Sequence, residues 1–154
     1  MPHPRITNFY CGSPEVLHEI EGATQSFVAG NLVKFSSGKI IIMADNDNVI
    51  AGQATADATG TTDDPCDVTA LKPGDVIVMG LDSGLPSALT VNARYEAKAS
   101  SGIHVIDATT GAVADGPFVY IGPFITPGYT AATATLGRFR IAGMGSQNEP
   151  TSTS

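Results

Sequence analysis

The sequence predicts an all-β fold, either a small β-barrel or β-tulip-like domain or a β-sandwich. Its 154 residues suit a single domain. With 17 glycines and 10 prolines, long helices are not expected. Short apolar runs separated by turn residues recur along the chain. We expect an N-terminal arm at residues 1–22, a β-rich domain at 23–142 and a flexible tail at 143–154.

The arm is interrupted by three prolines, at positions 2, 4 and 14, which oppose regular strand pairing. Ser13-Pro14-Glu15 could open a short helix that ends at Gly22. Its apolar residues Val16, Leu17 and Ile20 would then share one face. The alternative is an extended arm that lies on a neighbouring molecule, and the sequence leaves both open.

The first predicted hairpin joins Phe27–Phe35 to Lys39–Ala44 through the turn Ser36-Ser37-Gly38, in which glycine supplies a positive φ. A third strand is expected at Val49–Thr55. The polar run DATGTTDD, Asp57–Asp64, is typical of a loop.

Five further strands are expected in the rest of the domain. The Thr90–Ala99 segment shows the clearest alternation of apolar and polar residues, which is typical of an antiparallel strand with one wet face. The GMGSQNEPTSTS tail has almost nothing to bury. The five strands are Asp75–Gly80, Thr90–Ala99, Ile103–Asp107, Phe118–Ile121 and Leu136–Ile141.

The formal net charge of −7 argues against binding to nucleic acid or to an anionic membrane, because both need a basic surface. No apolar run approaches the roughly 20 residues of a membrane span. The first residues, MPHPRITNFYCGSPE, show no secretory signal pattern. We therefore expect synthesis in a cytoplasm.

The acidic cluster Asp45-Asn46-Asp47-Asn48 raises the question of a metal site. A calcium loop of the EF-hand type needs glycine at its sixth position and glutamate at its twelfth. Counted from Asp45, those positions hold Ile50 and Ala56. The cluster is therefore predicted to be the turn that follows a buried strand.

The sequence offers few other groups for chemistry. Cys11 and Cys66 lie in no metal-binding spacing, and we expect reduced thiols, although a disulfide between them stays open. His104 and Asp107 would lie on opposite faces of one strand, so they are not an acid–base pair. No cofactor, metal or catalytic residue is predicted.

The tripeptide Asp82-Ser83-Gly84 matches the signature of aspartic proteases, and Leu136-Gly137-Arg138 resembles a later segment of retroviral-type proteases. Leu85 and Pro86 follow the tripeptide where that family has a small residue leading into a strand. Asp-Ser-Gly is also common turn chemistry. A dimeric protease that uses Asp82 is kept as an alternative.

One family resemblance covers roughly residues 22–122. The segment GATQSFVAGNLVK, Gly22–Lys34, resembles the start of the small decoration, or cement, proteins of tailed-bacteriophage heads. The VIAGQA segment, Val49–Ala54, is similar to the strand that follows the first hairpin in that family. RYE, IHVID and FVYI, in Arg94–Ile121, resemble its second half.

The resemblance implies a non-enzymatic protein that sits on the capsid exterior of a virion, commonly as a homotrimer, and clamps subunits of the major capsid protein. We expect the arm to dock on the capsid or on a neighbouring decoration subunit. Packing against its own domain is the competing expectation. The candidate interface residues are Ile6, Phe9, Tyr10, Val16, Leu17 and Ile20.

Another virion β module, such as a tail or fibre component, is the main alternative to a decoration protein. A carbohydrate-binding domain is disfavoured, because such domains expose aromatic platforms and this chain has no Trp and only 4 Tyr.

Overall fold

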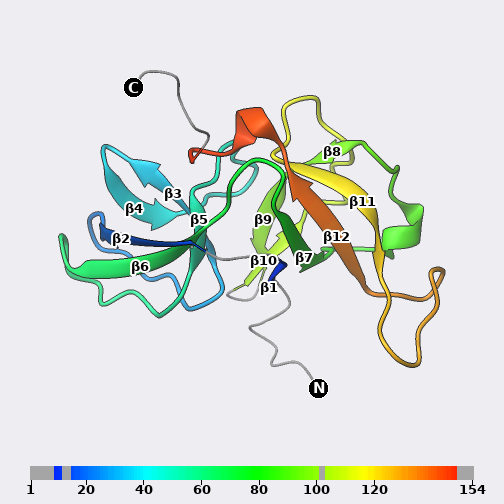
Figure 1. Cartoon of the computed structure of the whole chain (residues 1–154), viewed down its shortest axis with the longest axis horizontal. Coiled ribbons are helices and arrows are strands. Elements are labelled where there is room, and N and C mark those ends of the chain that lie inside the picture. Colours follow the sequence, from blue (N-terminus) through cyan, green and yellow to red (C-terminus); the bar gives the residue numbers. More distant parts are fainter. Residues whose placement is uncertain (1–8, 12–14, 101–102, 149–154) are drawn as a thin grey trace.

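The computed structural model describes residues 9–11, 15–100 and 103–148, and within them the fold is all-β. Two five-stranded sheets lie side by side, with a two-stranded hairpin beside the second (Figure 1). Helical structure in these residues is limited to two 3₁₀ turns, η1 (Pro86–Ala88) and η2 (Gly143–Gly145). The predicted fold class is confirmed.

The first sheet, called sheet I, is antiparallel with the order β2-β6-β5-β3-β4. It curls until its two edge strands approach each other, where the N–H of Gly22 donates to the carbonyl of Ile40 at 2.8 Å. A Cβ at position 22 would lie 2.6 Å from Cγ2 of Ile41, so this close approach needs glycine. The strands are β2 (Val16–Ile20), β3 (Leu32–Ser36), β4 (Lys39–Ile42), β5 (Gly52–Ala54) and β6 (Pro65–Ala70).

The second sheet, called sheet II, is antiparallel with the order β1-β7-β12-β11-β8. Tyr120, Phe139 and Ile77 stand opposite one another on its inner face, because they are paired in register. The strands are β1 (Phe9–Cys11), β7 (Val76–Gly80), β8 (Arg94–Tyr95), β11 (Phe118–Phe124) and β12 (Leu136–Ile141), and the separate hairpin is β9 (Ala97–Ser100) with β10 (Ile103–Ile106).

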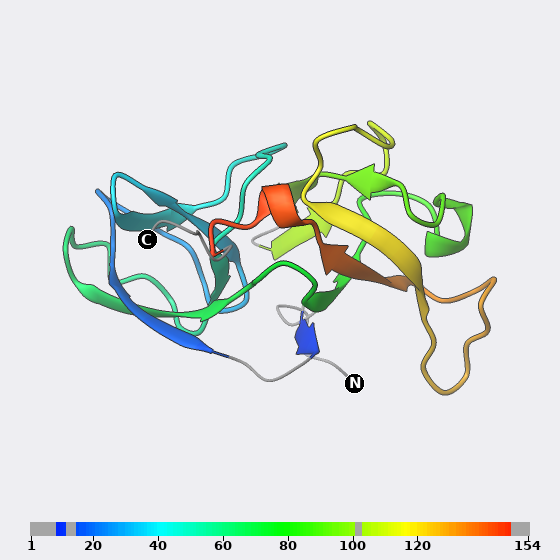
Figure 2. The ribbon, with the colours of Figure 1, turned by 45° about the horizontal axis from the view of Figure 1, so that its top comes forward.

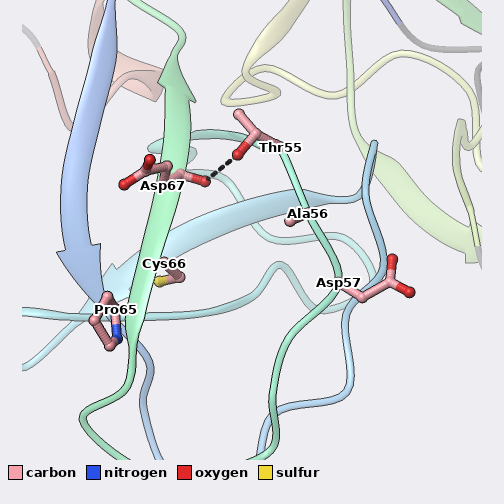
Figure 3. Close-up of a pocket in the computed structure, with 6 residues that line it drawn as sticks. All are labelled: Thr55, Ala56, Asp57, Pro65, Cys66 and Asp67. Atoms are coloured by element: carbon pink, nitrogen blue, oxygen red, sulfur yellow. Dashed lines mark hydrogen bonds between the residues drawn. The ribbon is translucent and has the colours of Figure 1, made fainter.

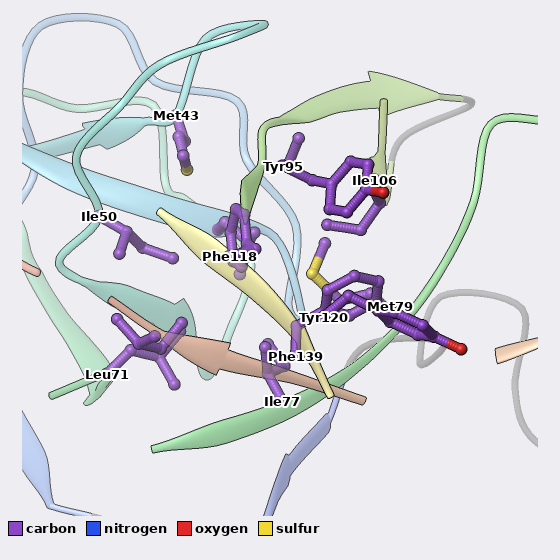
Figure 4. Packing of buried hydrophobic residues seen from close by; sticks show 13 residues of the cluster. Met43, Ile50, Leu71, Ile77, Met79, Tyr95, Ile106, Phe118, Tyr120 and Phe139 are labelled. Atoms are coloured by element: carbon purple, nitrogen blue, oxygen red, sulfur yellow. The ribbon is translucent and has the colours of Figure 1, made fainter. Parts of the chain in front are cut away.

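The main hydrophobic core joins the two sheets (Figure 4). Sheet II contributes most of its large side chains, among them Phe118 and Phe139, which are fully buried. Leu32 comes from sheet I, and Met43 and Leu71 come from segments that adjoin its strands. A second hydrophobic cluster is separate from the main core and lies within sheet I and the segments that adjoin its strands. Its buried members are Phe27, Val33, Ile40, Ala51, Ala54 and Val68.

Sheet I contains two strands that the sequence patterns did not predict. Val16–Ile20 is strand β2 and not a helix, and it pairs antiparallel with β6. Strand β6 begins at Pro65, where a missing N–H is tolerated, and it carries Asp67 on its exposed face. The arm boundary expected at residue 22 therefore falls after a strand that belongs to the sheet.

The strand predicted at Thr90–Ala99 is wrong in its first part. Thr90–Ala93 is a turn, closed by the N–H of Ala93 on the carbonyl of Thr90 at 3.1 Å, and Asn92 has a φ of 71°. The remainder divides into β8 in sheet II and β9 in the small hairpin. At Glu96 the chain passes from sheet II to the small hairpin. The alternation of apolar and polar residues continues through this point, so the pattern did not reveal that one strand ends and another begins.

The tail expected at Gly143–Ser154 differs in its first part, which runs between the two sheets (Figure 2). Ser146 is buried, and its hydroxyl donates to the carbonyl of Leu71 at 2.6 Å. The N–H of Gln147 donates to the carbonyl of Ile50 at 2.8 Å. These two hydrogen bonds hold in place a polar segment that has little apolar surface. The rest of the tail lies outside the described residues.

Candidate interaction surface

The N-terminal strands lie at sheet edges of their own chain. Strand β1, which contains Phe9 and Tyr10, pairs with β7 at one edge of sheet II, and only its backbone is described. Strand β2 lies at one edge of sheet I. Ile6 lies outside the described residues. Edge strands present backbone groups that can pair with another chain, so this position suits an interface.

The candidate residues of β2 divide between its two faces. Leu17 points inward, where it packs against the second hydrophobic cluster opposite Val68. Val16 and Ile20 point outward and are 46% and 37% exposed. Large apolar side chains on the solvent side of an edge strand are typical of a contact surface. We call the outward residues of β2 and β6 the β2 face: Val16, His18, Ile20, Pro65, Asp67 and Thr69.

The β2 face carries one polar pair among its apolar residues. Nδ1 of His18 lies 2.9 Å from Oδ1 of Asp67, and both side chains are largely exposed. The structure therefore brings Val16 and Ile20 together with a polar pair and separates Leu17 from them. The sequence could have indicated this division, because residues two apart on a strand share a face.

A pocket of about 230 Å³ lies between the Thr55–Asp57 segment and the first half of β6 (Figure 3). Its one thiol, Cys66, is free. Burial, together with the nearby carboxylates of Glu21 and Glu19, raises the pKa of Cys66 to about 11. The thiol is therefore protonated at neutral pH, and it lacks the character of a nucleophile or a metal ligand.

Glu21, whose charge acts on Cys66, is a fully buried residue that the sequence patterns missed. It accepts hydrogen bonds from the N–H groups of Thr59 at 2.7 Å and Gly60 at 3.1 Å. The polar loop at 57–64 is thus tied to the end of β2. Backbone N–H donors compensate the cost of burying the carboxylate.

The acidic turn at 45–48 is a structural turn, as predicted. The carboxylate of Asp47 accepts from the N–H of Ala44 at 2.7 Å and pairs with Lys34 at 2.9 Å. Oδ1 of Asp45 accepts from the N–H of Ala99 at 2.8 Å, so the turn holds β9 against sheet I. Among the residues that the structure describes, no group of three or more His, Cys, Asp or Glu side chains is arranged to hold a metal ion.

His104 is completely buried, and both of its ring nitrogens contact backbone groups of sheet I or of the segment that follows it. The N–H of Leu32 donates to Nδ1 at 3.0 Å, so Nε2 carries the ring proton and donates to the carbonyl of Met43 at 2.9 Å. Asp107 accepts instead from Asn46 and Thr110. The two residues thus have separate partners, in agreement with the strand-face argument.

The carboxylate of Asp82, the candidate protease residue, is held by an ion pair and by hydrogen bonds within the chain. Its carboxylate pairs with Lys98 at 2.9 Å and accepts from the hydroxyl of Thr109 at 2.8 Å and the N–H of Ala108 at 2.7 Å. Burial raises the pKa of Asp82, but these hydrogen bonds outweigh it and lower the pKa to about 2. A carboxylate held in this way clamps the loop after β10 to the end of β7.

Replacing Asp82 with asparagine is expected to lower the free energy of unfolding by about 1–3 kcal/mol, because Lys98 loses the nearer of its two charged partners and one acceptor becomes a donor. Since the pKa of Asp82 is about 2 instead of 3.8, its contribution is complete above about pH 4 and is lost as the pH falls towards 2. Urea unfolding at pH 7 measures the effect. Asp63→Asn is the matched control, because Asp63 pairs with Lys39 while 61% exposed, and a change below about 0.5 kcal/mol is expected there. Equal effects of the two substitutions would contradict the clamp.

Comparison with known proteins assigns this chain to no family. No model of a protein family matches this chain, and no similar protein is found among curated sequences. Within the described part of the chain, no helix is long and apolar enough to span a membrane.

Proposed function

We propose that this chain is a structural virion protein that decorates the outer surface of a tailed-phage capsid and stabilises the shell by bridging subunits of the major capsid protein. It works as a homotrimer, without a cofactor and without contact to nucleic acid or membrane. The observation that carries the proposal is the β2 face, where Val16 and Ile20 are exposed on an edge strand.

The family resemblance supports this proposal independently of the β2 face. Its segments, Gly22–Lys34, Val49–Ala54 and Arg94–Ile121, span strands β3 to β11, and the expected β-rich domain is the fold observed there. The net charge of −7 suits a protein that stays outside the shell and away from the genome.

In the proposed mechanism, many modest contacts between this protein and the shell subunits add up over the capsid surface. The apolar residues of the β2 face bury surface against a shell subunit, and the part of the β2 edge that precedes the contact with β4 at Gly22 can pair with a strand of that subunit. One such contact is weak, but a trimer that makes three of them binds with avidity and links the subunits it touches.

The first test is the protein content of purified particles from the source of this gene. A copy number comparable with that of the major shell protein is the result expected for a decoration protein. A trace level would indicate a tail or fibre component instead. Complete absence from particles would overturn the proposal, and peptide cleavage by wild-type protein and by the Asp82→Asn variant would then test the protease alternative.

Glutamate at both Val16 and Ile20 is expected to weaken binding to undecorated particles by about tenfold or more while the fold is retained, because charge replaces the apolar contact. Co-sedimentation with particles measures binding, and thermal unfolding measures the fold. Val91→Glu is the control, since Val91 is 55% exposed in another part of the surface. Undiminished binding of a folded double variant would exclude the β2 face as the contact.

A further inference from the structure

A histidine–aspartate pair lies at the centre of the β2 face. His18 and Asp67 stand opposite each other in the register of β2 and β6, and Nδ1 of the histidine lies 2.9 Å from Oδ1 of the aspartate. Val16 and Ile20 lie two positions before and after His18 on the same strand, so the three side chains share one face. A partner that covers both apolar residues therefore also covers the pair.

His18 is the group that can neutralise Asp67 on this face. Figure 3 shows the carboxylate of Asp67 pointing away from the Thr55–Asp57 segment, whereas its main-chain carbonyl accepts from the hydroxyl of Thr55 at 3.0 Å. Among the described residues, no lysine or arginine forms an ion pair with Asp67. The net charge of the pair is therefore decided by the protonation of His18.

The lysines nearest to the β2 face are already paired with other carboxylates. Before β2, Nζ of Lys72 lies 2.8 Å from Oε1 of Glu15. Near the other end of the strand, Nζ of Lys39 on β4 lies 2.6 Å from Oδ1 of Asp63, which precedes β6. Each of these ion pairs is neutral as a whole, so they do not replace the charge that His18 can supply.

The other carboxylates around β2 do not share its outward face. Glu19 alternates with the outward residues of the strand and points to the inner face. Glu21 is fully buried and accepts from backbone N–H groups. Asp57, across the pocket, accepts from the N–H of Ala29 at 2.9 Å. Between about pH 5 and pH 8, where histidine ordinarily changes its charge, the titrating group of the β2 face is therefore His18.

Docking changes the energetics of the pair, because it removes water from both groups. In the free protein the side chains of His18 and Asp67 are 80% and 48% exposed, so their ion pair contributes little. In an apolar contact, a lone carboxylate is costly to bury, whereas a carboxylate that is hydrogen-bonded to an imidazolium carries no net charge with it. Aspartate keeps its charge at neutral pH, so a covered pair favours the protonated histidine.

We infer that docking of the β2 face on a shell subunit is coupled to the uptake of one proton by His18. The inference rests on the proposed function and adds a pH-sensitive device to the same site. Because the docked state holds one proton more than the free state, linkage requires that attachment strengthens as the pH falls through the range of histidine titration. Particles are thus expected to hold this protein more tightly in mild acid than in mild alkali.

The test is co-sedimentation of the full chain with undecorated particles at pH 6 and pH 8, at constant ionic strength. Uptake of one proton changes affinity by at most tenfold per pH unit, and we expect wild-type protein to bind about tenfold more tightly at pH 6. His18→Gln retains a hydrogen-bond donor but cannot gain a charge, so it should lose most of this dependence. Asp67→Asn removes the carboxylate that the proton neutralises and should abolish or reverse the dependence.

Asp63→Asn is the matched control for Asp67→Asn. Asp63 is 61% exposed and pairs with Lys39 beside the β2 face, so its loss should leave the full pH dependence of wild-type protein. Thermal unfolding of each variant at both pH values separates a change in docking from a change in fold.

Equal pH dependence in wild-type protein and His18→Gln would overturn the inference, because groups of the shell or other groups of this chain would then control it. Tighter binding of wild-type protein at pH 8 would overturn it as well. Loss of the dependence in Asp63→Asn would do the same, since any nearby carboxylate would then suffice. Wild-type protein that binds particles at neither pH contradicts the proposed function and this inference with it, whereas binding that does not vary with pH contradicts this inference alone.

Discussion

Gly52→Ala is expected to lower the free energy of unfolding by about 3 kcal/mol or more, enough to leave much of the protein unfolded. Gly52 lies in β5, between β3 and β6. A Cβ there would lie 2.2 Å from the carbonyl oxygen of Thr69 and 2.6 Å from Cγ1 of Val68. The backbone of β6 cannot move away without losing its pairing with β5, so the overlap cannot be relieved cheaply.

The matched control for this substitution is Gly80→Ala. Gly80 ends strand β7, and a Cβ there would meet only Cδ2 of Leu136, at 3.8 Å, which is an ordinary contact. Its stability should change by less than about 1 kcal/mol in either direction. Urea unfolding of both variants measures the difference. Equal free energies of unfolding for the Gly52→Ala and Gly80→Ala variants would contradict the close approach of β6 to β5 at Gly52.

Local signals predicted the parts of the fold that depend on neighbouring residues. The hairpin of β3 and β4 follows from Ser37 and Gly38, which have φ values of 51° and 78° and form the two-residue turn that such hairpins favour. The turn at 45–48 was likewise predicted from residue types that tolerate turn geometry. In both cases the information lies within a few residues of the feature.

Long-range pairing explains what the patterns missed. Strand β2 has apolar residues that fit either a helix or a strand, and only its pairing with β6, about fifty positions later, decides between them. The buried carboxylate of Glu21 depends in the same way on Thr59, and the clamp on Asp82 depends on Lys98 and Thr109. Such contacts are set by tertiary structure.

The outer surfaces of the two sheets show the same limit of sequence patterns. Val16 and Ile20 were predicted as interface residues, but Leu17 was grouped with them because a helical face was considered alongside an extended arm. The neighbourhood of Arg94 and Arg140 was not predicted, since these residues come together only through the register of β8, β11 and β12.

His104→Ala is expected to lower the free energy of unfolding by about 3–5 kcal/mol. His104 is fully buried, and its ring accepts from the N–H of Leu32 and donates to the carbonyl of Met43. Removing the ring leaves both backbone groups buried without these partners and opens a cavity between β10 and sheet I. His18→Ala is the control, because the side chain of His18 is 80% exposed and its loss should cost below about 1 kcal/mol. Similar costs for the two histidines would contradict the bridging role.

The same histidine should make stability depend on pH below neutrality. Burial lowers the pKa of His104 from its ordinary 6.5, although the bond to Met43 and the charges of Asp45 and Asp47 oppose the shift. The unfolded chain therefore binds a proton at a pH where the folded chain does not. The contribution of His104 is complete above pH 6.5 and is lost as the pH falls below it, by up to about 1.4 kcal/mol per pH unit until the folded-state pKa is reached. Urea unfolding at pH 7 and pH 5 should show this loss in wild-type protein and a smaller loss in His104→Gln. An equal pH dependence in the two proteins would mean that other groups control it, and that His104 is not held neutral by the fold.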